Sequence, residues 1–354
     1  MISFFYESGN FIGPGEVSYS NTRNVSDIDI IYSSSTLPKL KLMTEFRKSN
    51  VSIERVGVLL GEYVIIGELL LLDRSGQVIK IGHSHDDVAL GDGVDRKVHD
   101  ANFKILCHEV LDKWDTISTV DCPHILTHPF FYNYYHFTLE LVSKLRHFEN
   151  VDNSTTLIPQ HYLSQSFQRS LLSRCLEGKK LITYSSPVKV CNPLLSTHSA
   201  IATPIQAANW VSNKIQLGTS TEGRQDCHYY ITRTGTRKVD ENSIFNSLLD
   251  KYSFKRVDFG LGDLSVDEQI AMLRGARLIV APHGAGLTNL IYLSESVKLI
   301  ELHGSNYCSS AFMQLCSSKN IKYSGLICSQ FLIDGSMVVD CDQLEHLLSL
   351  AVNY

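Results

Sequence analysis

The last third of the chain alternates regularly between short apolar segments and amphipathic ones. Five segments have the length and residue types of buried strands: 228–232, 254–259, 277–281, 298–302 and 321–326. Segments with helical spacing of apolar residues follow them: 242–251, 266–274 after an S-x-x-E capping box, 287–293, 309–318 and a last one from about 342. Parallel strands need long crossover connections, which helices provide. The alternation therefore predicts an α/β fold with a doubly wound parallel sheet.

The rest of the chain shows two further patterns. Short β-type runs broken by Gly, Asn and Asp occupy its beginning: 29–32, 55–60, 63–72 and 78–81, with a hairpin signal at 72–77. From about residue 155, a strand (156–158), a helix (165–176) and a strand (180–184) succeed one another. Turn-forming residues without apolar periodicity fill 217–226. We therefore expect an N-terminal domain over 1–217, β-rich in 1–120 and α/β in 121–217, and a second domain over 218–354.

Composition limits the class of protein. Of the 354 residues, 44% are hydrophobic and 19% are charged, which is typical of a folded globular protein. A formal net charge of -5 predicts no nucleic-acid partner, because non-specific binding requires a basic surface. The nine cysteines are odd in number and include no C-x-x-C pair, so neither a disulfide framework nor a zinc site is expected.

The start of the sequence has none of the features of a secretory signal. Its first residues, Met1-Ile-Ser-Phe-Phe-Tyr-Glu-Ser-Gly-Asn10, include neither a basic start nor an apolar run of the required length. Elsewhere, no segment approaches the roughly 20 uninterrupted apolar residues of a membrane span. A reducing cytoplasm is therefore the expected location.

The most specific local pattern lies where the predicted strand 277–281 ends. His283-Gly-Ala-Gly-Leu-Thr-Asn289 follows this strand and leads into the next predicted helix. Gly284 and Gly286 would let the backbone approach a ligand, and a helix N-terminus favours an anion such as phosphate. His283 stands at the carboxyl end of a strand, where open α/β sheets bind ligands. Such turns also occur where glycine only permits tight packing, so both interpretations remain open.

Several segments that carry these patterns occur in a fixed order. They are Tyr230-Ile-Thr-Arg233, 264–270, 276–290 and Leu299-Ile-Glu-Leu302, and they are preceded by Asn133-Tyr-Tyr-His-Phe-Thr-Leu-Glu-Leu141. Together they resemble glycosyltransferase family 61, and the earliest segment is similar to its Tyr-His-Trp motif. The family includes plant β-1,2-xylosyltransferases, eukaryotic O-linked N-acetylglucosamine transferases and bacterial members near polysaccharide loci. The resemblance implies a GT-B fold, in which two Rossmann-like domains face a cleft, and inverting transfer from a nucleotide sugar, by default a UDP-sugar.

The resemblance also implies that the second domain holds the donor. The expected donor-binding residues are Arg233, His283, Gly284, Ala285, Gly286, Leu287, Thr288, Asn289 and Glu301. Arg233 follows a predicted strand and can clamp phosphate bidentately, with a surface ion pair as the alternative. Glu301 lies within an apolar strand, where an unpaired carboxylate is costly. Its expected partner is either the two ribose hydroxyls of a nucleotide or a neighbouring Arg or Lys.

Inverting transfer needs a base that takes a proton from the acceptor hydroxyl. His136 and Glu140 stand four residues apart at the start of a predicted helix, so both side chains should lie on one face. Glu140 can orient the imidazole and raise its basicity, or it can itself be the base. The structural alternative is a His136 that only packs among the neighbouring aromatic residues.

The acceptor is less defined by this segment. Asn133 and Tyr135 are expected on the acceptor side, whereas Phe137 and Ser143-Lys-Leu145 depart from the Trp and the Pro-Arg-Leu that are usual in the family. We expect a glycan or lipid-linked glycan acceptor in capsule or O-antigen assembly. That acceptor fits a cytoplasmic location at the inner face of the membrane, with peripheral membrane association. None of these features predicts the oligomeric state.

Three patterns are typical of metal sites, and none has the appropriate context. Asp27-Ile-Asp29 and Asp340-Cys-Asp342 are D-x-D triplets, but neither ends a buried strand of the nucleotide domain. His83-Ser-His-Asp-Asp87 lacks the last His of the H-x-H-x-D-H pattern of binuclear metallohydrolases. We therefore expect no metal and no cofactor beyond the nucleotide-sugar substrate. The alternatives are a non-catalytic nucleotide-sugar-binding or assembly protein and, more remotely, a metallohydrolase that uses His83 and His85.

Overall fold

The computed structural model of the chain divides into two compact units. The N-terminal unit comprises Met1–Tyr19 and Val51–Val211, and the C-terminal unit comprises Ser20–Asn50 and Ser212–Tyr354. The structure describes residues 4–5, 11–20, 28–31, 51–67, 70–80, 101–121, 123–128, 130–149, 155–176, 178–196, 205–216, 227–260, 263–294 and 296–353. The expected domain boundary and the turn-rich stretch 217–226 lie outside these residues.

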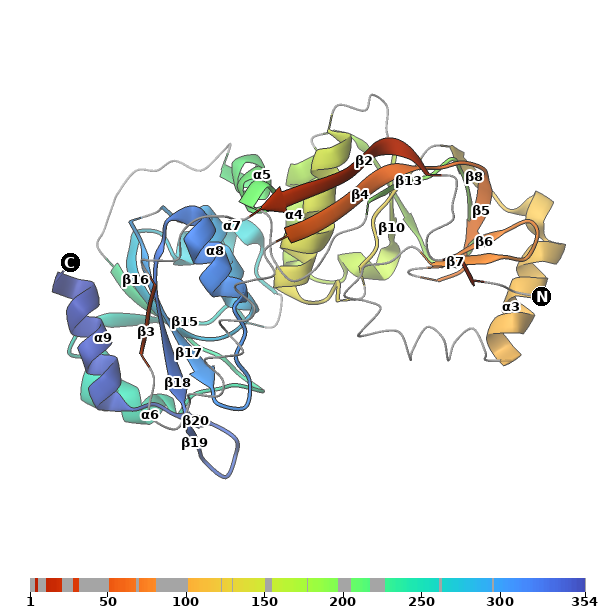
Figure 1. Cartoon of the computed structure of the whole chain (residues 1–354). Helices are drawn as coiled ribbons and strands as arrows, with labels where there is room; N and C mark the ends of the chain where they lie inside the picture. Colours follow the sequence, from red (N-terminus) through yellow and green to blue (C-terminus); the bar gives the residue numbers. More distant parts are fainter. Residues whose placement is uncertain are drawn as a thin grey trace. The chain divides into compact units, whose positions relative to one another are not determined.

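A six-stranded sheet forms the centre of the C-terminal unit (Figure 1). Its strands are β3 (Ile28–Ile31), β14 (Cys227–Ile231), β15 (Phe254–Val257), β16 (Ala276–Pro282), β17 (Lys298–Gly304) and β18 (Lys322–Cys328). They lie in the order β15-β14-β16-β17-β18-β3, and every neighbouring pair is parallel. The five strands predicted between 228 and 326 are all confirmed, and the chain has the α/β fold class expected of it.

The order in which the chain adds strands to this sheet changes direction at β14. From β14 the chain moves outward to β15 at one edge, and it then crosses to β16 on the other side of β14. The connections that leave β14 and β16 therefore run in opposite directions. This is the topological switch point of a doubly wound sheet, and ligands bind at its carboxyl edge in folds of this type. Arg233 and His283, which follow β14 and β16, lie at that edge.

Helical segments cover the sheet on both faces (Figure 1). They are α6 (Glu241–Ile244), the π-helix η5 (Phe245–Leu249), α7 (Val266–Met272), the 3-10 helix η6 (Ala285–Tyr292), α8 (Ala311–Lys319) and α9 (Cys341–Asn353). Ser265 and Glu268 form the predicted capping box at the start of α7. The helix expected from 287 is 3-10 rather than α, because a short segment that is buried almost all round takes its winding from packing rather than from intrinsic propensity.

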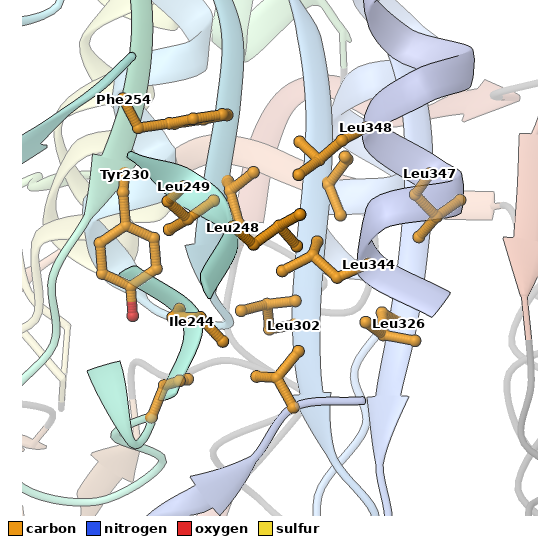
Figure 2. Close-up of a cluster of buried hydrophobic side chains, with 14 of the residues drawn as sticks. Tyr230, Ile244, Leu248, Leu249, Phe254, Leu302, Leu326, Leu344, Leu347 and Leu348 are labelled. Carbon is orange, nitrogen blue, oxygen red and sulfur yellow. The ribbon is translucent and has the colours of Figure 1, made fainter. Parts of the chain in front are cut away.

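One face of the sheet holds a large apolar core (Figure 2). Leu344, Leu347 and Leu348 of α9 pack onto it, and all three are at most 2% exposed. Tyr230 of β14, Ile244 of α6, and Leu248 and Leu249 of η5 complete the labelled cluster with Phe254, Leu302 and Leu326. Burial of each such leucine stabilises the fold by about 1.5–3 kcal/mol. This core packs against β14 through Tyr230.

Two further six-stranded sheets form the N-terminal unit. One has the order β1-β7-β6-β5-β12-β8 and the other β11-β10-β9-β13-β4-β2. The strands are β1 (Phe4–Phe5), β2 (Phe11–Ser20), β4 (Val51–Leu59), β5 (Glu62–Ile65), β6 (Leu70–Asp73), β7 (Val78–Lys80), β8 (Thr119–Asp121), β9 (His124–Ile125), β10 (Thr155–Pro159), β11 (Lys180–Tyr184), β12 (Val188–Cys191) and β13 (Leu194–Ser196). The helices that the structure describes there are α3 (Ala101–Asp112), η1 (Trp114–Thr116), η2 (His136–Leu141), η3 (Val142–Phe148), η4 (Gln160–Leu163) and α4 (Ser166–Leu176), and α5 (Ile205–Gln216) runs across the boundary between the units.

Local predictions for this unit are largely confirmed. The strand, helix and strand expected over 156–184 are β10, α4 and β11, with β10 and β11 parallel. The predicted hairpin at 72–77 joins β6 to β7, and the Asp73 carboxylate accepts the backbone N–H groups of Ser75 and Gln77. The run 63–72, however, is divided between the two antiparallel strands β5 and β6.

Strands from the beginning of the chain complete sheets whose other strands come much later in the sequence. β5 pairs with β12, β4 pairs with β13, and β3 pairs with β18 of the C-terminal unit. The last pairing makes β3 an edge strand of the parallel sheet. Among the residues that the structure describes, no helix is long and apolar enough to cross a membrane. No disulfide joins any two of the eight cysteines that the structure describes.

Candidate active-site residues

A short helix with unusual winding carries the predicted base. Asn133 caps its start, because the side-chain oxygen accepts the backbone N–H groups of Tyr135 at 2.9 Å and of His136 at 3.5 Å. Over η2 the helix is π-type, and the Val142 N–H bonds to the carbonyl five residues earlier. Single π-helical turns are uncommon in proteins, but those that occur often lie at functional sites. Asn133, which was expected on the acceptor side, thus has a clear structural role as a helix cap.

His136 and Glu140 lie on one face of η2, as their spacing predicts. The Nδ1 atom of His136 is 2.5 Å from Oε2 of Glu140. The Glu140 side chain is only 1% exposed, whereas that of His136 is 24% exposed. With Nδ1 bonded to the carboxylate, Nε2 is the His136 nitrogen that can exchange a proton with another molecule. The arrangement is therefore suited to an imidazole base oriented by a buried carboxylate.

A second histidine, His128, holds the same carboxylate oxygen. Its Nε2 lies 3.0 Å from Oε2 of Glu140, and its ring stacks on that of His136 with centroids 5.4 Å apart. Burial alone would raise the pKa of Glu140, but the contacts with His136 and His128 hold this pKa well below its ordinary value. Glu140 is therefore ionised at neutral pH despite its burial.

The proton position on His128 follows from its other ring nitrogen. Nδ1 accepts the backbone N–H of Phe130 at 3.1 Å, so Nδ1 carries no proton and Nε2 must carry the one that a neutral ring retains. Burial lowers the pKa of His128 to about 4, although Glu140 opposes this shift. Above that pH His128 is therefore a neutral hydrogen-bond donor to Glu140.

The C-terminal unit brings two of the predicted donor residues together at the switch point. Arg233 extends from the end of β14 across Gly284, so closely that a methyl group added to Gly284 would overlap its Nη1 atom. Similarly, a methyl group on Gly286 would lie 2.9 Å from the ring of Phe259. The space beside both glycines is thus occupied by the protein's own side chains. Tight packing, the second interpretation of this turn, therefore explains both glycines.

Glu301 has the partner that its burial requires, and this partner is neither an arginine nor a lysine. Its Oε1 lies 2.6 Å from Nδ1 of His283, and its Oε2 accepts the hydroxyl of Tyr323 at 2.8 Å. His303 contacts both groups, with Nε2 at 3.0 Å from the Tyr323 hydroxyl and 3.3 Å from Oε2. Burial alone would raise the pKa of Glu301, but both histidines hold it far below its ordinary value. With 0% exposure, Glu301 is placed to orient His283 rather than to touch a ligand itself.

A second arginine lies beside Arg233. The Arg237 guanidinium stacks over the Tyr307 ring at 4.6 Å from the centroid, and the Tyr307 ring lies 5.4 Å from that of His283. Burial and the charge of Arg237 both lower the pKa of Arg233. Two cations held close together favour an anion between or beside them. This edge of the sheet is therefore suited to a phosphate group.

The other expected donor residues are located on η6. Leu287, Thr288 and Asn289 are at most 1% exposed, and the Asn289 amide donates to the Gln269 side chain at 3.0 Å. Their side chains serve the packing of η6 against its neighbours. Of the expected donor set, Arg233 and His283 thus have the side-chain positions best suited to meet a ligand.

Sequence reasoning missed several residues of these two clusters. They are His128, Tyr162, His303, Tyr307 and Tyr323. A signal for His128 was present, since it stands three residues after the end of β9, whereas His283 directly follows β16. Tyr323 and His303 gave no such signal, because contacts between neighbouring parallel strands depend on register.

Among the residues that the structure describes, two groups could hold a metal by residue type and proximity: His128, His136 and Glu140, and His283, Glu301 and His303. In the first group, the protonated Nε2 of His128 has no lone pair for a metal. In the second, the carboxylate already accepts hydrogen bonds on both oxygens. Of the D-x-D triplets, Asp340 caps α9 by accepting the Gln343 N–H. Asp27, His83 and His85 lie outside the described residues.

Comparison with known protein families gives one match. Residues 134–300 match the family model Glycosyltransferase 61. The match supports membership of glycosyltransferase family 61 and indicates a glycosyltransferase. The family 61 region includes His136, Glu140, Arg233 and the turn after β16, whereas His128 lies before it and Glu301 directly after it. No curated protein matches the chain.

Proposed function

We propose that the protein is an inverting glycosyltransferase that moves a sugar from a nucleotide donor to a glycan hydroxyl. The observation that carries this proposal is the His136–Glu140 pair within the family 61 region: a part-exposed imidazole bonded through Nδ1 to a buried, ionised carboxylate. A protein that only binds a nucleotide sugar needs no such pair. This contrast favours an enzyme over the non-catalytic alternative.

In the proposed reaction, His136 acts as the base. Its Nε2 takes the proton of the acceptor hydroxyl as the hydroxyl oxygen attacks the anomeric carbon. The bond from that carbon to the phosphate oxygen breaks on the opposite face, which inverts the configuration. Glu140 is covered, so it cannot reach an acceptor; it stabilises the imidazolium that forms. Tyr135, whose ring meets that of His136 at 5.3 Å, borders the acceptor in this scheme.

The leaving group is a nucleoside diphosphate, whose charge must be balanced as it departs. Arg233 and Arg237 supply fixed positive charge at the carboxyl edge of the C-terminal sheet. His283, which is oriented by Glu301, adds a hydrogen-bond donor there. Ala285 and the two glycines of the turn contribute backbone. Together these groups can stabilise a diphosphate with no metal ion and no cofactor.

The further details of the proposal come from the family resemblance. They are a GT-B organisation, in which the N-terminal unit supplies the base and the C-terminal unit holds the donor, and a uridine nucleotide as the carrier. The proposed acceptor is a glycan or lipid-linked glycan of a capsule or O-antigen. The proposed location is the cytoplasm, with peripheral association at the inner face of the membrane.

A ligand screen followed by an activity assay tests the proposal. Nucleoside diphosphates and their sugars are added to the purified protein, and the melting temperature is recorded with and without divalent metal. A ligand at 100 times its Kd stabilises the native state by about 2.7 kcal/mol, so a binder is easily seen. We expect a uridine diphosphate to raise the melting temperature without metal, and the wild type but not His136→Ala to hydrolyse the donor slowly. No shift with any nucleoside diphosphate would refute the proposed function.

A further inference from the structure

We propose that His128 is a positioning residue for the reaction: its uncharged N–H holds the Glu140 carboxylate ionised and directed at His136. Nothing in the proposed chemistry requires a second histidine on that carboxylate. The proposal rests on the proposed function for its kinetic consequences, but its structural content can be tested without any activity.

The tautomer of His128 is set by the main chain. The Phe130 N–H points at Nδ1 from 3.1 Å, so the ring proton is on Nε2, which is 3.0 Å from Oε2 of Glu140. While this backbone N–H bonds to Nδ1, a neutral His128 keeps its proton on Nε2 and donates it to Glu140. His136 bonds to the same oxygen at 2.5 Å. Glu140 thus receives one hydrogen bond from a fixed neutral group and one from the ring that exchanges protons.

The backbone of His128 is held equally firmly. The Tyr162 hydroxyl donates to the His128 carbonyl at 2.8 Å and accepts from the His128 N–H at 3.2 Å, and Tyr162 is fully buried. The Tyr162 ring stacks on Phe131 with centroids 4.0 Å apart, and Gln168 of α4 donates to the Phe131 carbonyl. The segment that places the ring is therefore clamped from two helical elements.

The surrounding charges favour an uncharged His128. Lys144 of η3 is buried nearby, and its Nζ donates to the Thr127 carbonyl at 3.1 Å. The charged or titratable groups that act on His128 are Lys144, Glu140 and His136. A proton added to His128 would meet the charge of Lys144 and would compete with His136 for the Glu140 charge. Because His128 stays neutral, the attraction of the carboxylate remains available to the imidazolium of His136.

Two substitutions separate positioning from simple packing. His128→Leu removes the N–H, whereas His128→Gln places an uncharged N–H donor near the position of Nε2. We expect kcat to fall at least about 10-fold in His128→Leu with donor Kd unchanged, and to stay within about threefold in His128→Gln. The pH–kcat profile should change in His128→Leu but not in His128→Gln, because a hydrogen bond that favours ionised Glu140 is lost only in His128→Leu. His108→Gln, on the exposed face of α3, is the control.

Nitrogen-15 NMR of the histidine rings tests the structural content directly. His128, assigned by its loss in His128→Gln, should be neutral at pH 7 with a proton on Nε2, and the His136 Nδ1 resonance should move when His128 is replaced. A His128 that is cationic or protonated on Nδ1 in the wild type overturns the proposal even if no variant is active. Equal kcat and pH profiles for the Gln and Leu variants also overturn it. If the wild type transfers no sugar but the NMR result holds, the proposed function fails and the His128 assignment stands.

Discussion

The guanidinium of Arg233 lies directly against the backbone of Gly284, where a β-carbon on the glycine would overlap Nη1. Arg233 also donates from Nε to the Thr236 carbonyl at 2.6 Å. Two segments that are far apart in the sequence, the end of β14 and the turn after β16, are thereby joined at the switch point. The arginine can sit there only because position 284 carries no side chain.

The Gly284→Ala variant is therefore expected to displace Arg233 without unfolding the protein, since the obstructing atom is the end of a flexible side chain. The Kd for a uridine diphosphate should rise about 10-fold or more, as in Arg233→Ala, because a charge-assisted bond to phosphate is lost. The double variant should bind no worse than either single variant. Isothermal titration calorimetry measures all four proteins, with Thr234→Ala in the same exposed loop as the control. Additive losses would contradict the shared mechanism.

Replacement of the proposed base should affect turnover rather than binding. His136→Ala is expected to lower kcat by about 10²–10⁴-fold, the usual contribution of general base catalysis. Glu140→Gln keeps the shape of the side chain but removes the charge that stabilises the imidazolium, so its kcat should also fall. Donor Kd should change little in either variant. Steady-state kinetics and calorimetry check this, and wild-type turnover in both variants would exclude the pair as the catalytic base.

The N-terminal unit should lose stability as the pH falls from about 6.5 towards 4. Burial lowers the pKa of His128 to about 4 and that of His124 well below its ordinary value, so in this range the unfolded chain binds protons that the native state does not. Stability therefore rises with pH, by about 1.4 kcal/mol per pH unit for each histidine, and it is fully present above about 6.5.

Tryptophan fluorescence can follow this transition, because both tryptophans, Trp114 and Trp210, belong to the N-terminal unit. Urea unfolding at several pH values between 4 and 7 gives the slope of stability against pH. In His128→Gln the slope should decrease by about one proton, whatever the absolute stability of the variant. An unchanged slope would show that His128 is not buried in its neutral form.

The network around Glu301 makes a separate prediction about stability. Tyr323→Phe leaves a buried carboxylate oxygen without the hydroxyl that donates to it at 2.8 Å, which should cost about 1–3 kcal/mol. Tyr229→Phe, in a strand of the same sheet, is the matched control, because its part-buried hydroxyl donates to a main-chain carbonyl at 2.9 Å and its loss should cost less. Circular dichroism in denaturant gives both free energies of unfolding. Equal losses in the free energy of unfolding would mean that the hydrogen bond from Tyr323 to the buried carboxylate stabilises the fold no more than an ordinary hydroxyl–carbonyl bond does.

Removal of divalent metal should leave donor binding and turnover unchanged. The reason is chemical: His128 Nε2 carries a proton, and the Glu301 carboxylate already accepts a hydrogen bond on each oxygen, from His283 and Tyr323. Elemental analysis of the purified protein, and activity after chelation with and without added Mn²⁺ or Mg²⁺, provide the test. Stoichiometric zinc, or activity restored by one of these ions, would overturn the expectation.

The parallel sheet and the positions of its helices were predictable, because the spacing of apolar residues within each segment indicates a strand or a helix. The capping box at Ser265 and the hairpin at Asp73 are equally local, and both are confirmed. The winding of η2, η5 and η6 was not predictable, since tertiary packing rather than propensity sets it. Local sequence patterns could not predict the pairing of β3 with β18 either, because these strands are almost three hundred residues apart in the sequence.

In the candidate sites too, contacts within one segment were predictable and contacts between distant segments were not. The contact of His136 with Glu140 could be read from a spacing of four along one helix. His128 meets that pair through the tertiary arrangement of β9 and η2, and Tyr323 meets Glu301 across two strands whose register no local pattern encodes. The glycines of the turn were recognised as special, but the side chains that occupy their space, Arg233 and Phe259, come from other segments.

The π-helical turn gives η2 room for one residue more than ordinary winding would hold. In an α-helix each residue advances the chain by about 100° around the axis, and the wider π-turn spreads one extra residue over nearly the same revolution. Deletion of one residue from η2 would therefore restore α-helical winding and leave the residues that follow in nearly the same orientation. Lys144, which donates to the Thr127 carbonyl, could keep its place. A relative that is one residue shorter in this segment can therefore keep the same surroundings for the site.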